Sequence, residues 1–167
     1  MNQIINKITF LLFPFLFLVS CTKQKFGPLS DVRPSIPVTV QNAIDYRPEP
    51  TVSTSLSGGG NITITLTIPA NSGRTIKEVT KVAASTSYTK IQSTSTTGFY
   101  TTAPIPGNGT SVTFTTSVTE YFSKNPVSSS NPAAKANNEL AFRFYFMITL
   151  DDGSVIIPEP VRVLVLS

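Results

Sequence analysis

Apolar and polar residues alternate along much of this chain with a period of two. The clearest run is Asn61–Ile68 (NITITLTI), where four aliphatic residues share one face and three threonines the other. This pattern indicates a half-buried β-strand. Residues 76–84 fit both a strand and a helix, and their short length between stronger strands favours a strand. Further strands are expected at 51–56, 111–118, 140–150, 155–157 and 161–166.

The sequence Asp151-Asp152-Gly153-Ser154 separates the last apolar runs and predicts a β-hairpin. With Asp152-Gly153 as a two-residue loop, every inward-facing pair is apolar except Phe146–Glu159. That misfit lies beside Pro158 and Pro160 and predicts a β-bulge there. Because proline cannot donate a backbone hydrogen bond, the same two residues predict an edge strand. The predicted register pairs Leu140 with Val165, Phe142 with Val163, Phe144 with Val161 and Ile148 with Ile157.

These runs predict seven to nine short strands, with turn signals about every ten residues, and no segment is assigned as a helix. We expect an all-β fold, an antiparallel immunoglobulin-like β-sandwich, with a small β-barrel as the alternative. The chain has one Cys and no Trp, so the Cys–Trp–Cys framework of antibody domains is missing. The predicted core contains Ile62, Ile64, Leu66, Phe142, Phe144, Ile148 and Val163.

Residues 1–20 are typical of a secretory signal peptide. Lys7 precedes an apolar run, Ile8–Val19, which is too short to span a bilayer as a helix. The run ends in Leu18-Val19-Ser20-Cys21, which resembles the bacterial lipobox. The resemblance implies cleavage after Ser20 and a diacylglyceryl group on Cys21; the alternative is a chance Cys behind an ordinary signal peptide. Several acyl chains at one Cys would give stable membrane anchoring.

Residues 21–50 are expected to form a lipidated tether and a first strand. Five prolines between positions 28 and 50 disfavour a helix and favour extended backbone. Ile36–Val40 is a candidate edge strand. The sandwich domain is then expected to occupy residues 51–167.

Composition excludes several kinds of chemistry. Without His and with a single Cys, the chain has no His-containing catalytic triad, no Cys/His zinc site and no intrachain disulfide. The nine acidic residues are scattered, and their one adjacent pair, Asp151-Asp152, is explained by its turn, with a calcium site there as the alternative. We therefore expect no catalytic residues, no metal and no cofactor. A net charge of +4 is too small to indicate nucleic-acid binding.

Several segments resemble small lipoproteins of Bacteroidota: the lipobox, GGGNITITLTI, TIKEVTKVAA, and LDDGSVIIP followed by VRV. That family has no assigned activity, so the resemblance implies no site residues. Its surface-exported members often carry an acidic run after the Cys, whereas Thr22–Lys25 is basic here. This departure favours a domain that faces the periplasm rather than the cell surface. Thr22 rather than Asp after the Cys favours, by analogy with enterobacterial sorting, an anchor in the outer membrane.

Two groups of side chains are candidate binding residues. The hairpin register places Arg143 beside Arg162 on the outward face, with Tyr145 as a neighbour. They could form a patch for an acidic partner, since Arg and Tyr are enriched at binding hot spots; the alternative is that Glu78 bridges both guanidinium groups.

The second candidate group is Tyr88, Phe99 and Tyr100, which could stack on a glycan if all three rings were coplanar and exposed. The sequence thus predicts a non-enzymatic envelope module with a structural or protein-interaction role. A glycan-binding lipoprotein is the alternative.

Overall fold

The structure is a computed structural model that describes residues 34–95, 97–101 and 103–167. The signal peptide, Cys21 and the start of the tether lie outside these ranges. Residues from Arg33 onward form one compact unit. Its strands are β1 (Thr39–Val40), β2 (Thr51–Ser55), β3 (Asn61–Thr67), β4 (Ile76–Ser85), β5 (Ile105–Pro106), β6 (Ser111–Ser117), β7 (Asn138–Glu139), β8 (Arg143–Leu150), β9 (Val155–Ile156) and β10 (Arg162–Leu166).

The first layer of this unit is a three-stranded antiparallel sheet in the order β1-β3-β6. The alternation of apolar and polar residues in β3 explains which face of this sheet packs on the core, because Ile62, Ile64 and Leu66 are buried while the threonines between them point outward. The long strands were predicted within one residue of their observed bounds, except that β8 begins three residues later than expected, at Arg143.

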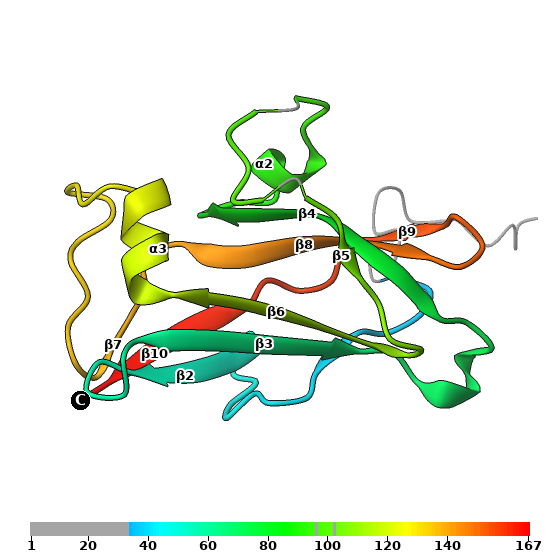
Figure 1. The fold of residues 1–167 in the computed structure, drawn as a ribbon, viewed down its shortest axis with the longest axis horizontal. Coiled ribbons are helices and arrows are strands. Elements are labelled where there is room, and N and C mark those ends of the chain that lie inside the picture. Colours follow the sequence, from blue (N-terminus) through cyan, green and yellow to red (C-terminus); the bar gives the residue numbers. More distant parts are fainter. Residues whose placement is uncertain (1–33, 96, 102) are drawn as a thin grey trace, which may run out of the picture. The chain divides into compact units, whose positions relative to one another are not determined.

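The second layer contains the orders β5-β4-β8-β9 and β2-β10-β7. A bridge between Phe144 and Val161 joins these two sheets. Strand β2 runs parallel to β10, and the other pairings are antiparallel. Figure 1 shows β3 and β6 lying against β8 and β10. The fold is thus an all-β sandwich of immunoglobulin-like strand order, with open sheet edges in the described ranges rather than a closed barrel.

The core lies between the layers and is rich in aromatic rings. Phe114 of β6 contacts Phe144 and Phe146 of β8, at centroid distances of 5.4 and 5.6 Å. Six of the seven predicted core residues are at most 1% exposed. The exception is Phe142, which is only partly buried and packs against the edge of the core.

The C-terminal hairpin differs from its predicted register. Leu150 N donates to Ser154 O, so the loop has three residues, with Gly153 in the left-handed region at φ 83°. Ile148 therefore pairs with Ile156 rather than with Ile157. Phe144 still pairs with Val161, which requires one extra residue between β9 and β10. The extra residue lies beside Pro158 and Pro160, where a bulge was predicted, but residues 157–160 form no strand there and interrupt the pairing.

On the C-terminal side of this segment, β10 pairs with residues 138–140 in yet another register. Leu140 N donates to Val163 O and Leu164 pairs with Glu139, so the predicted pairs Leu140–Val165 and Phe142–Val163 are wrong. The predicted edge position is confirmed for β9, which ends the order β5-β4-β8-β9, and is wrong for β10, which lies between β2 and β7. Pro158 and Pro160 are buried rather than facing solvent.

Two short helices were not predicted: α2 (Thr89–Gln92) and α3 (Val118–Lys124). A single 3-10 turn, η2 (Ala70–Ser72), follows β3. The candidate edge strand at Ile36–Val40 is confirmed in part, because β1 pairs with β3 at the edge of that sheet and Val40 is buried in the core. The compact unit that contains these strands includes this segment. No helix in the described residues is both long enough and apolar enough to cross a bilayer.

Candidate functional site

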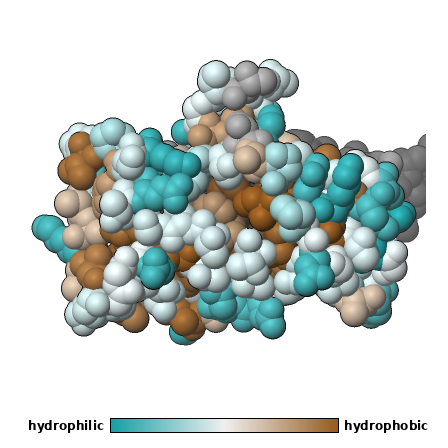
Figure 2. All heavy atoms as spheres, viewed as in Figure 1, coloured by the Kyte–Doolittle hydropathy of each residue, from teal (hydrophilic) through white to brown (hydrophobic). Residues whose placement is uncertain are grey.

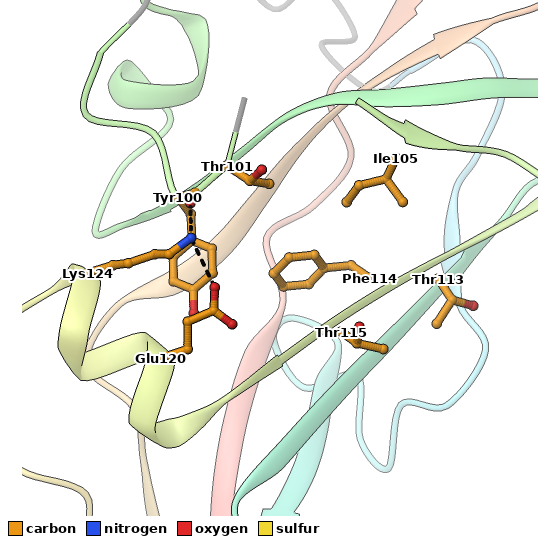
Figure 3. Close-up of a pocket in the computed structure, with 8 residues that line it drawn as sticks. All are labelled: Tyr100, Thr101, Ile105, Thr113, Phe114, Thr115, Glu120 and Lys124. Atoms are coloured by element: carbon orange, nitrogen blue, oxygen red, sulfur yellow. Dashed lines mark hydrogen bonds and ion pairs between the residues drawn. The ribbon is translucent and has the colours of Figure 1, made fainter. Parts of the chain in front are cut away.

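A groove of about 230 Å³ opens between β6 and the segment that leads into β5. Figure 2 shows apolar atoms exposed in the gap between β5 and β6, and Figure 3 shows the side chains around it. We call this feature the β6 groove. It is lined by Tyr100, Thr101, Ile105, Thr113, Phe114, Thr115, Glu120 and Lys124.

The alternation of β6 builds one side of the groove. Phe114 points inward and is 5% exposed, while Thr113 and Thr115 on either side are exposed. The Phe114 ring lies 5.8 Å from the ring of Tyr100. Together with Ile105, it gives the groove an apolar floor with hydroxyl groups beside it (Figure 3).

Helix α3 closes one end of the groove. Its N-cap, Ser117, accepts a hydrogen bond from Glu120 N at 3.1 Å. Glu120 and Lys124 form an i,i+4 ion pair of 3.0 Å, and Lys124 Nζ also donates to Tyr100 O at 2.7 Å. The same ammonium lies 4.6 Å from the centroid of the Tyr100 ring. Lys124 therefore ties α3 to the opposite side of the groove.

A chain of hydrogen bonds continues from the ion pair into the core. Thr116 Oγ1 donates to Glu120 Oε2 at 2.9 Å, since a carboxylate can only accept. The hydroxyl of Thr116 has one hydrogen, so Tyr100 Oη must donate to Thr116 Oγ1 across their 2.5 Å contact. The buried hydroxyls of Tyr100 and Thr116 thus each have a hydrogen-bond partner.

These contacts set the protonation states of the site. The ion pair with Lys124 and the Thr116 bond lower the pKa of Glu120. Burial raises the pKa of Tyr100 to about 12, and the bond to Thr116 opposes this shift. Near neutral pH the carboxylate is ionised and already paired, and the phenol keeps its proton. The arrangement suits ligand binding more than proton transfer, because an efficient general base needs a pKa near the operating pH.

The predicted arginine patch is not a free surface. Arg143 Nε lies 2.8 Å from Glu49 Oε2, and Arg162 Nη1 lies 3.0 Å from Glu139 Oε1. Arg162 Nη2 also donates to the carbonyl oxygen of Arg47 at 2.9 Å. Carboxylates do neutralise both guanidinium groups, but they are Glu49 and Glu139, so the predicted bridge by Glu78 is wrong.

Tyr145, the third member of that patch, is only 1% exposed. It points to the outer face of the sheet, as predicted, but helix α2 and the loops around it cover that face (Figure 1). There Tyr145 packs with Ala83 and Ile91 in a second hydrophobic cluster. The prediction fails because helix α2, which was not predicted, supplies Ile91 as a covering side chain.

The three rings of the predicted glycan platform do not share a surface. Tyr100 is 5% exposed and belongs to the main core, whereas Phe99 packs against the second cluster and Tyr88 is 39% exposed. The Tyr88 ring meets the Tyr145 ring edge-on at 4.9 Å. All three rings thus have packing partners, and the coplanar, exposed platform is not formed.

The acidic pair in the hairpin loop is used by the turn. Asp152 Oδ1 accepts from Ser154 N at 2.9 Å, and Asp152 Oδ2 lies 2.9 Å from Arg74 Nη2. Asp151 Oδ1 accepts from Thr75 N at 3.2 Å. Within the described ranges, no group of three or more His, Cys, Asp or Glu is placed to hold a metal ion.

Of the groove residues, sequence analysis named only Tyr100 as a candidate and missed seven: Thr101, Ile105, Thr113, Phe114, Thr115, Glu120 and Lys124. A signal for two of them, Glu120 and Lys124, was present, because Ser117 followed three residues later by Glu120 is a capping-box pattern that starts a helix.

Comparison with models of protein families, with curated proteins and with solved structures finds no match to this chain.

Proposed function

We propose that this protein is a lipid-anchored module of the bacterial cell envelope with a structural or protein-interaction role and no enzymatic activity. The observation that carries the proposal is the lipobox Leu18-Val19-Ser20-Cys21, placed directly behind a twelve-residue apolar run, Ile8–Val19. A lone Cys at that position has a specific chemical use, as the thiol that receives the lipid.

The position of the folded unit supports this anchor. The compact unit begins at Arg33, so the segment Thr22–Val32 separates it from Cys21. A chain of that length spans at most about 40 Å, since an extended residue adds roughly 3.3–3.6 Å. The tether would hold the sandwich close to the membrane while allowing its groove to meet a second protein.

We further propose that the protein belongs with the small lipoproteins of Bacteroidota that it resembles, and that it is anchored in the outer membrane facing the periplasm. The basic residues Lys23 and Lys25 after the Cys support this orientation. The β6 groove supports an interaction role, because it combines an apolar floor with polar groups that can fix the orientation of a ligand.

The test is replacement of the acceptor thiol. Cys21→Ser should leave the protein uncleaved or release it from the membrane, whereas the matched control Thr22→Ser should be processed and pellet with the membranes. Incorporation of labelled fatty acid should be lost only in Cys21→Ser. Unchanged pelleting and labelling of Cys21→Ser would refute the anchor.

A further inference from the structure

Backbone hydrogen bonds determine which edge of β6 is paired. Val118 N donates to Gly60 O, and Ile68 N donates to Thr110 O. In the antiparallel register of β3 with β6, Ile64 pairs with Phe114. Backbone groups alternate in direction along a strand, so Phe114 faces β3, as do Thr110 and Val118. The N–H and C=O groups of Thr113 and Thr115 therefore face the other way.

The residues that the structure describes provide no hydrogen-bond partner for those four backbone groups. The opposite edge of the same sheet is treated differently. Gln41 N donates to Thr65 O, and the Asn42 side chain both donates to Thr63 O and accepts from Thr65 N. One edge of the sheet is thus covered by β1 and Asn42. On the β6 edge Ser111 pairs with Asn108, and the described residues leave the edge open at Thr113 and Thr115.

Strand β6 itself lacks the sequence features that protect natural edge strands. Natural edge strands are kept short or carry Pro or charged residues, which prevents pairing with other chains. Among the described strands, β5 contains Pro106, and β1, β7 and β9 have two residues each. Strand β6 has seven residues, Ser111–Ser117, with neither Pro nor a charged side chain.

This open edge borders the β6 groove. A guest strand adds about 4.7–4.9 Å from its neighbour, with alternate side chains on opposite faces. Hydrogen bonds to Thr113 and Thr115 would direct every second guest side chain toward Phe114 and Ile105 on the groove floor (Figure 3). The other guest side chains would lie beside the exposed threonines.

We propose that the β6 groove binds an extended peptide segment of a partner protein, with apolar residues at alternate positions, which adds to the sheet as a strand beside β6. This deepens the proposed interaction role by naming the chemistry of the partner. Main-chain hydrogen bonds would provide affinity and the floor would select apolar side chains. A second copy of the chain fits poorly, because α3, Tyr100, Thr101 and Ile105 flank the edge, and the same flanking residues of a second copy would collide with them.

The direct test uses a synthetic peptide and the full chain purified in detergent. The probe is a heptapeptide with the alternating sequence of β3, NITITLT, flanked by lysines for solubility. At saturating peptide, amide hydrogen exchange measured by NMR should slow at least tenfold at Thr113 and Thr115. Unchanged exchange at both amides with millimolar peptide would overturn the proposal, as would protection confined to other strands.

Protein variants separate backbone pairing from side-chain contact. Thr115→Pro removes an edge N–H that β3 does not use, and Pro is tolerated at such positions. It should weaken peptide binding at least tenfold, whereas Thr115→Val keeps the N–H and should bind within about threefold of the native protein. Equal binding by the two variants would contradict strand addition.

Peptide variants on the unaltered protein provide a second arm that does not depend on how Thr115→Pro folds. N-methylation of the amides at odd or at even positions of the heptapeptide blocks one set of donors at a time. One methylated peptide should lose binding and the other should keep it, because only one set faces β6. Similar affinity for both would overturn the proposal. Neither arm uses the anchor, so this proposal can fail while the Cys21 result stands.

Discussion

Tyr121 and Asn131 are joined by a buried hydrogen bond, in which the tyrosine hydroxyl donates to Asn131 Oδ1 at 2.9 Å. The same hydroxyl accepts from Phe142 N at 3.0 Å, and Asn131 Nδ2 donates to Asn125 O at 2.7 Å. Both residues are at most 1% exposed. One phenol thus links helix α3, the loop that follows it and the approach to β8.

Tyr121→Phe should destabilise the protein by about 1–3 kcal/mol, because it leaves the Asn131 oxygen and the Phe142 N–H without their shared partner. Urea unfolding measures the change. Tyr88→Phe is the control, since its ring is partly exposed, and it should stay within about 0.5 kcal/mol of the native protein. Equal effects of the two variants would contradict a structural role for the buried network.

Phe144→Ala should cost about 3–5 kcal/mol. The Phe144 side chain is fully buried, and its ring lies 5.2 Å from Tyr100 and 6.0 Å from Tyr121, between the two layers. The control is Val127→Ala at a position that is 59% exposed, with an expected change below about 0.5 kcal/mol. A melting temperature of Phe144→Ala within a degree or two of the native value would show that this ring does not support the core.

The strands and their core-facing sides could be predicted from sequence, because the alternation of apolar and polar residues along a strand follows the alternation of buried and exposed positions. Ile62, Ile64 and Leu66 follow a strict period of two. In a half-buried strand such residues share one face, and that face must be the one that packs on the core. The hairpin register could not be fixed in this way, since Asp-Gly fits both a two-residue loop and the three-residue loop with Gly153 left-handed. Loop length depends on packing that the sequence does not display.

The candidate site was harder to predict for a different reason. The outward direction of Tyr145 followed from alternation, but its burial depends on Ile91, which a distant segment brings over the sheet. The β6 groove similarly joins an edge strand, a short helix and residues 100–105. Sequence patterns describe one element at a time, so such combinations emerge only from the tertiary structure.

The two arginines of the predicted patch should differ when each is replaced. Arg162→Gln should destabilise the protein by about 1.5–3 kcal/mol, because the Arg162 side chain is 16% exposed and bonds both Glu139 and the Arg47 carbonyl. Arg143→Gln should cost about 0–1 kcal/mol, since its side chain is 38% exposed and forms one ion pair. Urea unfolding of both variants tests the order, and a larger loss for Arg143→Gln would contradict it.

Alkaline pH should destabilise the protein through two buried phenols. Burial raises the pKa of Tyr100 and of Tyr121 to about 12, whereas a tyrosine in the unfolded chain ionises near 10. This stabilisation is complete below pH 10 and is lost as the pH rises toward 12, because the unfolded state releases its protons first. Each phenol should account for about 2–3 kcal/mol over that range.

The measurement for these phenols is urea unfolding at several values between pH 9 and pH 12, together with tyrosinate absorbance. Tyr100→Phe and Tyr121→Phe should each flatten the dependence of the unfolding free energy on pH. Ionisation of every tyrosine near pH 10 with the fold intact would contradict the raised pKa values.

Two glycines beside strands should respond very differently to an added methyl group. A Cβ at Gly107 would overlap the backbone carbonyl of Ile76, and Gly107 N donates to Lys77 O at 2.9 Å, so the chains cannot separate without losing that bond. Gly107→Ala should therefore cost about 3 kcal/mol or more. At Gly153 the space is open and only the left-handed backbone, φ 83°, opposes Ala, so Gly153→Ala should cost about 1–2 kcal/mol. Thermal unfolding of the two variants measures the difference, and a smaller loss for Gly107→Ala would show that β4 and the turn after β5 do not approach as closely as the structure has them.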